Sequence, residues 1–532
     1  MHYPREAFTE EERAKLSNHF TNLESPVFAL INLPETVKGA LFARYSRYQG
    51  TLRRLFLEEF ADGLPDIGEL PKLSEGRRAA ELYERVFIGF GDDSVAQLGG
   101  AHVACEWTSN VMTKVLQRPR LASYLEQSTR YIPYDRPMQG SDYRYYRHPA
   151  LGMAYESAMD FLFESYSELL PHVRKWLDKA APGGRSDSPA VRERMLKAKS
   201  LDLLRGLLPA SSLSHMGIFA TGQAYESLIL HLLAHPLPEA RRYGSMMLNE
   251  LEAVIPSFVA RIERPDRGGE WVSFLRARQQ RAADTAARFG LDEIQTESLP
   301  SVRLLDHEGS EADILVSLLF EASTSSEVEI RERVEAMPSD ERSALLGVLV
   351  GPRTNRRHRP GRGFERVRYR FEIVSDYAAF RDLQRHRLLT VQWQGLTPDL
   401  GAHMPDELEQ AGVSDTYHRA LERSQHEYHR LIDENLGWAA PYALCLAFRM
   451  RYVLDLTARE ALHVIELRSS RQGHDSYRLV AQEMFKGIED VHPGVAEAMS
   501  FVDHSPPDSL HRAVQRLDEE DQLRITGLIQ KA

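Results

Sequence analysis

Cysteine is scarce in this chain, and it has neither a long apolar run nor an excess of positive charge. The two cysteines, Cys105 and Cys445, are too few for a disulfide framework or a four-cysteine zinc site. No apolar run approaches the ~18–20 residues of a membrane span, and the N-terminus lacks the apolar core of a secretory signal. We therefore expect a cytoplasmic protein. The net charge of −11 disfavours a general nucleic-acid binder, which is more often basic, so no nucleic-acid partner is expected.

The length and the periodicity of the sequence predict a two-domain α+β protein. At ~100–200 residues per domain, 532 residues exceed one ordinary domain. Helical spacing of apolar residues runs through segments 189–208, 221–233 and 457–467, whereas alternation at 366–374, and more weakly at 102–107, predicts strands. The stretch 264–300 is polar and lacks strand signals. We predict an N-terminal domain over 1–264, a connector over 265–300 and a C-terminal domain over 301–532.

Two pairs of short segments indicate that the halves are diverged copies of one domain. Segment 117–123 (QRPRLAS) matches segment 384–390 (QRHRLLT), and the two lie half a chain length apart. A weaker match aligns Tyr225 with Arg459 and Ala234 with Arg468, at a smaller separation. If both matches hold, the second half has fewer residues than the first half between its two matched segments.

Residues 118–131 (RPRLASYLEQSTRY) carry the most specific pattern. They resemble the signature of the flavin-dependent thymidylate synthases (the ThyX family), which is Arg-His-Arg, seven residues, then Ser, with Glu two before that Ser and Arg two after it. Glu126, Ser128 and Arg130 stand at these places, but Pro119 replaces the histidine. The second half has the intact triplet at 385–387 and loses the Glu, Ser and Arg.

Further segments extend the resemblance over both halves. Arg205 precedes Leu-Pro as in the family segment whose arginine binds the nucleotide phosphate, and segment 458–468 resembles the family's Asn-Ala-Arg…Leu-Arg helix. Segments 362–365 and 91–94 stand at the family's His-Glu-Thr-Pro-Phe-Glu turn and keep little of it. Asp382 stands where the family has Gln, and Thr457 where it has Asn.

The pattern of loss predicts one composite site. In the family, one subunit of a homotetramer supplies the Arg-His-Arg block, and another supplies the Glu-x-Ser-x-Arg loop and the arginine before Leu-Pro. Here the second half keeps the Arg-His-Arg block, and the first half keeps the Glu-x-Ser-x-Arg loop and the arginine before Leu-Pro. The resemblance thus implies a homodimer that imitates the tetramer and two ThyX-like domains, each a small, mostly antiparallel sheet with flanking helices.

The implied reaction is methylation of dUMP at C5, with FAD as cofactor and with NADPH and methylenetetrahydrofolate as co-substrates. The resemblance assigns substrate binding to Glu126, Gln127, Ser128, Arg130, Arg205, Asp382 and Arg385. It assigns flavin binding to Ser94, Arg385, His386, Arg387, Thr457, Arg459 and His463. Arg468 would polarise the pyrimidine ring. Both cysteines lie in apolar surroundings without a neighbouring cation, which disfavours a cysteine nucleophile.

Several alternatives stay open. The protein could be a non-catalytic paralogue that binds a nucleotide or a partner protein, or it could methylate another pyrimidine nucleotide. The basic run 353–370 could hold phosphates of flavin or NADPH, bind RNA, or be a solvated loop. His426 and His429 do not have the spacing of the two zincin histidines, and we expect no metal site.

Overall fold

The computed structural model describes residues 4–33, 35–61, 97, 99–130, 132–138, 142–180, 189–291, 300–471 and 473–506. The chain divides into two compact units, and neither is continuous in sequence. Unit 1 comprises Met1–Ser167, Leu207–Thr296 and Arg419–Cys445, and unit 2 comprises Glu168–Gly206, Glu297–His418 and Leu446–Ala532. Each unit therefore contains a segment from the opposite half of the sequence. No described helix is long and apolar enough to span a membrane.

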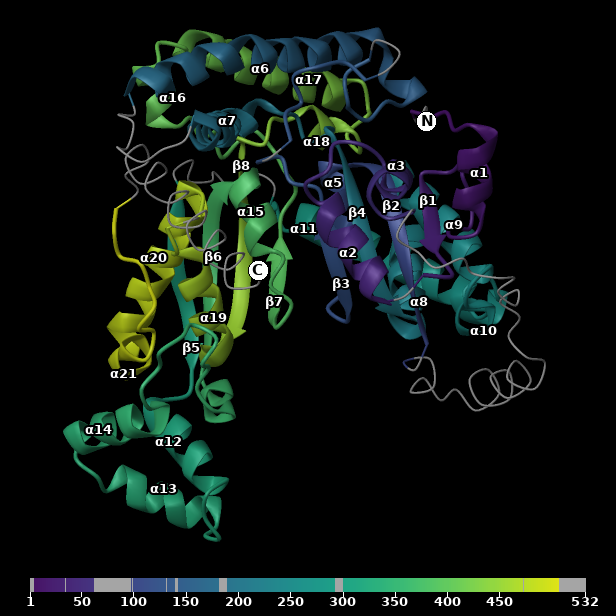
Figure 1. Cartoon of the computed structure of the whole chain (residues 1–532). Coiled ribbons are helices and arrows are strands. Elements are labelled where there is room, and N and C mark those ends of the chain that lie inside the picture. The colour runs from purple at the N-terminus through teal and green to yellow at the C-terminus, as the bar shows by residue number, and fades with distance from the viewer. Residues whose placement is uncertain are drawn as a thin grey trace. The chain divides into compact units, whose positions relative to one another are not determined.

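Unit 1 is built on a four-stranded antiparallel sheet (Figure 1). Its strands are β1 (Val27–Leu30), β2 (Gly100–Ser109), β3 (Ala122–Glu126) and β4 (Leu213–Thr221), in the order β1-β2-β4-β3. Strand β2 includes the predicted strand at 102–107, and all but its first residue are buried.

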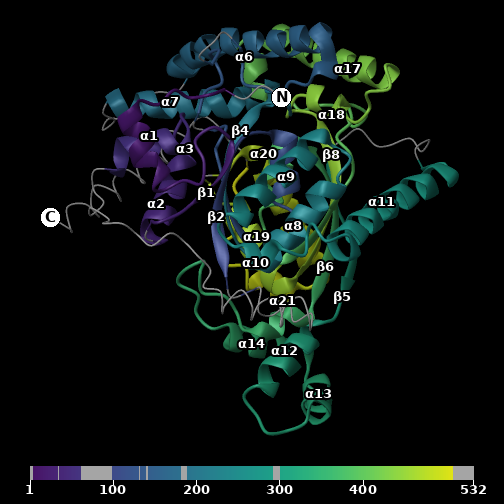
Figure 2. The same ribbon diagram turned by 90° about the vertical axis from the view of Figure 1, so that its right-hand side faces the viewer.

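Helices surround this sheet. They are α1 (Glu10–Ser17), α2 (Glu35–Tyr45), α3 (Leu52–Glu59), α5 (Asn110–Leu116), α8 (Gly222–Ala234), α9 (Pro238–Glu252), α10 (Pro256–Val259), α11 (Glu270–Arg288) and α18 (Ala440–Ala443), with short turns η4 (Pro149–Leu151) and η6 (Pro265–Gly269). Two long helices, α6 (Gly152–Ala180) and α17 (Ser414–Asp433), have residues in both units. In Figure 2, α11 extends as a single helix away from α8 and α10.

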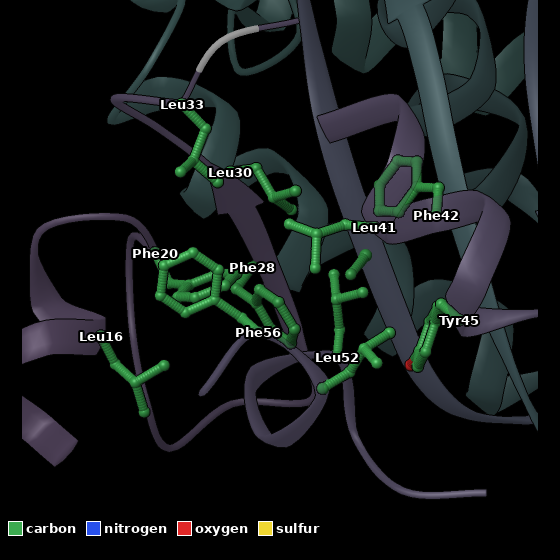
Figure 3. Close-up of a cluster of buried hydrophobic side chains, with 12 residues drawn as sticks. Leu16, Phe20, Phe28, Leu30, Leu33, Leu41, Phe42, Tyr45, Leu52 and Phe56 are labelled. Carbon is green, nitrogen blue, oxygen red and sulfur yellow. The ribbon is translucent and has the colours of Figure 1, made fainter. Parts of the chain in front are cut away.

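A cluster of apolar side chains joins the N-terminal helices of unit 1 to its sheet (Figure 3). Phe20 packs edge-on against Phe28 and Phe56, with ring centroids 5.5 and 5.4 Å apart. These rings are almost fully buried, and at ~25 cal/mol per Å² of apolar surface each contributes roughly 1.5–3 kcal/mol. The Arg53 guanidinium lies 3.9 Å from the centroid of Phe28 and covers one side of the cluster.

Unit 2 repeats the same sheet. Its strands are β5 (Ser301–Glu308), β6 (Arg368–Asp376), β7 (Leu389–Trp393) and β8 (Arg449–Thr457), antiparallel throughout and in the order β5-β6-β8-β7. The predicted strand at 366–374 is β6, which begins and ends slightly later in the chain. On β8 every second residue is buried, because alternate side chains point to opposite faces of a sheet. The predicted α+β fold with antiparallel sheets and flanking helices is confirmed.

The helices of unit 2 are α7 (Pro189–Leu204), α12 (Glu311–Phe320), α13 (Glu327–Glu335), α14 (Ser339–Val350), α15 (Tyr377–Leu383), α16 (Asp406–Gln410), α19 (Ala458–Arg468), α20 (Asp475–Val491) and α21 (Pro493–Glu497), with short 3-10 helices η5 (Arg205–Leu207) and η8 (Arg362–Arg366). Helices α12, α13 and α14 group at one end of β5 and β6 (Figures 1 and 2). Helices α19 and α20 pack against each other, and α20 also packs on β5 and β6.

Helix caps and strand starts fix how the two halves correspond. The stronger sequence match aligns Ala122 with Leu389, and these are the first residues of β3 and β7. The weaker match was out of register, because Thr457 caps α19 just as Thr221 caps α8. With these two threonines aligned, the first-half counterparts of Arg459 and Arg468 are positions 223 and 232, not Tyr225 and Ala234.

Candidate functional site

Asp382 lies between two arginines that are far apart in the sequence. Its carboxylate oxygens are 3.6 Å from Nη1 of Arg205 and 3.8 Å from Nη1 of Arg385. Arg205 belongs to the first half of the sequence, yet segment 168–206 folds as part of unit 2. The structure thus brings together three residues that the resemblance assigns to the substrate.

Arg205 is a buried cation with unused donors. It is 3% exposed, and its Nε and Nη2 have no hydrogen-bond partner among the described residues. Asp202, one turn earlier, lies 3.9 Å from Nε, too far for a hydrogen bond. Leaving such donors unsatisfied is costly, and the forked geometry of a guanidinium matches the oxygens of a phosphate. An anion is therefore the group that would complete this position.

Gly206 makes the turn that carries Arg205 possible. Its carbonyl accepts the N–H of Ala447 at 2.9 Å. A Cβ at position 206 would lie 2.3 Å from Oη of Tyr417. Glycine therefore leaves room for the Tyr417 hydroxyl beside η5, the short helix that bears Arg205.

Arg468 contacts the histidine of the Arg-His-Arg triplet. Its Nε donates a hydrogen bond of 2.9 Å to Nε2 of His386, while Nδ1 of His386 lies 3.6 Å from Oε1 of Glu460. Burial and the Arg468 charge hold the pKa of His386 well below its usual value. The ring is therefore neutral, and because Nε2 accepts, its proton is on Nδ1 and faces Glu460.

Glu460 and His463 complete this buried cluster on α19. Burial raises the pKa of Glu460 to about 7, although Arg359 and Arg459 oppose the shift. Burial, and then the charges of Arg359, Arg356 and Arg468, lower the pKa of His463 to about 4. The rings of His386 and His463 lie edge to face, with centroids 5.5 Å apart. At neutral pH the histidines carry no charge, so the arginines dominate the local field.

His386, Glu460 and His463 also offer ligand atoms that all lie within 4.8 Å of one another, a donor set that Zn²⁺ could use. A metal-bound histidine usually gives its second nitrogen to a carboxylate or a carbonyl. Here that nitrogen accepts from Arg468 instead, and further arginine charges act on the cluster. The electrostatics favour an anion or a neutral ring over a cation, and we assign no metal.

Two residues that are predicted to contact flavin form hydrogen bonds with other residues of the protein. Thr457 Oγ1 accepts the N–H of Glu460 at 3.3 Å and so caps α19. Arg459 Nε donates to the carbonyl of Pro360 at 3.0 Å, and its Nη1 lies 3.5 Å from Glu365. These contacts position the segment before β6. Of the triplet, His386 is buried, whereas its neighbours Arg385 and Arg387 are exposed.

Glu126, in unit 1, belongs to a buried polar cluster. Its Oε2 accepts from Nζ of Lys114 at 3.0 Å and from Nε2 of Gln117 at 2.9 Å, and Lys114 also donates to Gln117 at 2.8 Å. The side chains of Lys114 and Glu126 are 3% and 1% exposed. This carboxylate already has hydrogen-bond partners at the end of β3, and a contact with substrate stays a prediction.

The rest of the Glu-x-Ser-x-Arg loop forms a turn in unit 1. Gln127 Nε2 donates to the carbonyl of Tyr48 at 2.7 Å, and its Oε1 accepts from Arg144 at 2.8 Å. Ser128 Oγ accepts the N–H of Arg130 at 3.2 Å. The loop has a defined shape, but its predicted role in nucleotide binding is not tested by these contacts. Ser94 lies outside the described residues.

A cavity of about 390 Å³ in unit 2 adjoins the Arg205 position through Asp202. Trp176 lines it, as does Lys199, which lies 3.4 Å from Glu407 and 3.7 Å from Asp475. Its size is at the lower end of small-molecule sites. Sequence patterns did not identify this cavity or the contribution of Arg359. The basic run around Arg359 was visible, but its position beside α19 was not.

Comparisons with known proteins agree with the duplicated architecture. The profile of the family described as thymidylate synthase complementing protein matches residues 54–257 and again 303–494. A UPF0159 protein of Chlamydia muridarum is 38% identical over 518 residues, covering 94% of this chain and 96% of that protein. A UPF0159 protein of Chlamydia pneumoniae is 37% identical over 528 residues, covering 97% and 98%.

One solved structure is similar to part of the chain. It is described as a UMP/dUMP methylase PolB from Streptomyces cacaoi bound with 5-Br dUMP, with a TM-score of 0.32 and 20% identity over 39% of this chain and 98% of that one. This likeness is too weak to carry a functional conclusion. The double profile match and the two relatives of full length confirm the resemblance: the chain belongs to the thymidylate synthase complementing protein (ThyX) family, in a tandem form with two copies of the family domain.

Proposed function

We propose that this protein is a flavin-dependent thymidylate synthase-like enzyme that methylates C5 of dUMP. The overall reaction converts dUMP, methylenetetrahydrofolate, NADPH and a proton to dTMP, tetrahydrofolate and NADP⁺. The observation that carries the proposal is the meeting of Arg205 with Asp382 and Arg385, since these residues come from the two sets that the halves retain separately. Family membership supports the same class of enzyme.

In this proposal the nucleotide phosphate binds at Arg205. Two unused donors of a buried guanidinium can form charge-assisted hydrogen bonds with phosphate oxygens, and Arg385, which is exposed, can turn toward the same group. Asp382 holds both arginines near one point before substrate arrives. A dianionic phosphate would take over part of the charge neutralisation that Asp382 provides to the two arginines. The nucleotide is therefore expected to bind more tightly than its uncharged nucleoside.

Arg468 is the proposed catalytic residue. Its hydrogen bond to His386 fixes the guanidinium at the end of α19, and its charge can stabilise negative charge that develops at the N3 or carbonyl edge of the pyrimidine. Burial raises the pKa of the thiols of Cys105 and Cys445, which removes both as thiolate nucleophiles. The chemistry would therefore proceed without a protein nucleophile.

The residues around His386 fit a flavin in part. The neutral ring of His463 offers an edge and hydrogen-bonding nitrogens beside His386, whose own nitrogens already face Arg468 and Glu460. The surrounding arginines suit the anionic side of a dinucleotide. Bound reduced flavin would supply the two electrons of the reductive step. Thr457 and Arg459, by contrast, already hold internal partners and would have to exchange them to reach a flavin.

Those internal contacts favour a second candidate, a non-catalytic paralogue that binds a nucleotide at Arg205 without flavin. The two can be separated by adding FAD to the apoprotein and following quenching of flavin fluorescence. Flavin uptake supports the enzyme, whereas tight binding of dUMP without flavin uptake supports the paralogue.

The decisive experiment is an assay of dTMP formation from dUMP, methylenetetrahydrofolate, NADPH and FAD. Wild-type protein is expected to form dTMP, and Arg385→Gln is expected to lose most activity. Arg118→Gln, the matched change in the first-half triplet, is expected to keep it because that copy lacks its histidine. No dTMP from wild-type protein would refute the proposal, and equal loss from both variants would refute the single site.

A further inference from the structure

Both ends of the Gln127 side chain are bonded inside unit 1. The residue is 1% exposed. Its Nε2 donates to the carbonyl of Tyr48 at 2.7 Å, and its Oε1 accepts from Nη2 of Arg144 at 2.8 Å. Its backbone N–H donates to the carbonyl of His215, on β4, at 2.9 Å. The amide group of Gln127 therefore anchors the loop 127–130 to the body of unit 1.

Arg144 supplies the charged end of this anchor. A guanidinium only donates and a backbone carbonyl only accepts, so the amide oxygen of Gln127 faces Arg144 and the amide nitrogen faces Tyr48. Hydrogen bonds from a charged donor are stronger than those between neutral groups. Without a donor at position 144, the amide oxygen would be left buried and unpaired, which is costly.

Two aromatic rings flank the Arg144 guanidinium. Its Cζ lies 4.8 Å from the ring centroid of Tyr134 and 5.2 Å from that of Trp107. The arginine is 6% exposed, and its Nε has no hydrogen-bond partner among the described residues. The faces of aromatic rings attract a cation and can replace oxygen partners. Within the described part of unit 1, Gln127 is the group to which this guanidinium donates.

Trp107 has an unusual backbone conformation at this point. Its φ is +58°, in the left-handed region, and the pairing of β2 with β4 shifts register between Cys105 and Thr108. Its N–H donates to Nδ1 of His215 at 3.1 Å, and the two rings meet edge to face with centroids 4.5 Å apart. Such a conformation is costly for a bulky residue and is typical of functional sites. Here it places the indole beside the Arg144 guanidinium.

We propose that Arg144 is a positioning residue that holds the loop 127–130 in its binding shape through Gln127. The loop carries Ser128 and Arg130, whose part in binding dUMP rests on the proposed function. Ser128 Oγ accepts the N–H of Arg130 at 3.2 Å, so a displacement of the anchor reaches both residues. Arg144 itself contacts no substrate and acts through the amide to which it donates.

The test uses two variants of Arg144 and one matched control. Arg144→Met keeps a long side chain without donors, and Arg144→Lys keeps a charge on a smaller donor. The control is Arg53→Met. Arg53 is also 6% exposed in unit 1 and lies against an aromatic ring, that of Phe28, but it donates to the carbonyls of Leu23 and Ser25. Circular dichroism checks folding, and Arg144→Lys carries the test if Arg144→Met does not fold.

Hydrogen–deuterium exchange of the full chain without ligand measures the shape of the loop. In Arg144→Met, the peptide that contains residues 127–130 should exchange at least about tenfold faster, because its backbone hydrogen bonds open more often. Arg144→Lys should give an increase of about threefold, since one donor remains. Arg53→Met should leave this peptide within about twofold of wild type.

Binding and kinetics with dUMP test whether that shape matters for the substrate. Arg144→Met should bind dUMP at least about tenfold more weakly and raise KM with little change in kcat, because the loop binds the nucleotide and takes no part in the reaction. Gln127→Leu should cause a similar loss. The variant that carries both changes should lose no more affinity than the weaker of the two single variants, because both act through one contact.

Other results overturn the proposal. These are unchanged exchange of 127–130 in both Arg144 variants, an equal increase in Arg53→Met, wild-type dUMP affinity in Arg144→Met, or additive losses when Gln127→Leu is combined with it. Wild-type protein that binds no dUMP would refute the proposed function alone. In that case, faster exchange confined to 127–130 still supports Arg144 as the residue that positions the loop.

Discussion

Arg468 donates its Nε–H to Nε2 of His386 across 2.9 Å, and this bond joins the end of α19 to the Arg-His-Arg triplet. The bond requires a neutral imidazole with its proton on Nδ1, which Glu460 faces at 3.6 Å. His386 thus accepts from Arg468 through one ring nitrogen and faces Glu460 with the other, and the Arg468 charge helps to keep the pKa of His386 low.

Replacing Arg468 by lysine keeps the charge but removes the planar donor that reaches His386. We expect dTMP formation to fall at least about 100-fold with little change in dUMP affinity. The variant loses an interaction that stabilises the transition state more than the bound substrate. The control is Arg471→Lys, since Arg471 is an exposed arginine just beyond the same helix. Wild-type activity in Arg468→Lys would contradict the catalytic assignment.

Replacing Arg205 by lysine is expected to weaken dUMP binding about 10- to 100-fold, because a point charge cannot form the paired hydrogen bonds of a guanidinium. Deoxyuridine, which lacks the phosphate, should bind both proteins equally. Calorimetric titration of the two ligands provides the comparison. An equal loss for deoxyuridine would assign Arg205 a structural role instead.

Glu460→Gln should change stability in a pH-dependent way. The pKa of Glu460 is raised from 4.5 to about 7, so between these values the folded protein binds a proton that the unfolded chain has released. Wild-type stability from this group therefore falls as pH rises from about 4.5 to 7. Urea unfolding should find the variant more stable by about 1–3 kcal/mol at pH 8 and equal to wild type near pH 4. A constant difference at both pH values would contradict the assignment.

Lys114→Met should destabilise unit 1 by roughly 3–5 kcal/mol, because it leaves the buried carboxylate of Glu126 without its cation. Adding Glu126→Gln to that variant removes the uncompensated charge and should recover much of the loss. Urea unfolding of the single and double variants measures the coupling. A double variant no more stable than Lys114→Met would show that the ion pair is not the source of the effect.

The duplicated sheets were predictable because they follow local rules. Alternation of apolar side chains in β6 and the signature block before β3 survive in the sequence, and the spacing of the two blocks matches that of β3 and β7. The weaker sequence match, which paired Tyr225 with Arg459, gave the wrong spacing between the halves. Its two segments are short, and they lie where the halves differ in length. The helix caps Thr221 and Thr457 define that register, and a threonine before each helix was the available signal.

The site itself was only partly predictable, since its contacts are set by tertiary structure. The resemblance identified Arg205 and Asp382, but not that they would lie 3.6 Å apart. Lys114 resembles an ordinary helix residue in the sequence and becomes the buried partner of Glu126. Arg459 was predicted to contact flavin, yet it donates to the carbonyl of Pro360, which no local pattern indicates.

The exchange of segments between the two units constrains how such a gene can change. Unit 2 includes residues 168–206, which precede the connector, and unit 1 includes residues 419–445, which follow it. A break within 265–300 would yield two fragments that each lack part of a fold and that separate Arg205 from Asp382. No single cut near the midpoint of this chain therefore leaves every segment of one unit on one fragment.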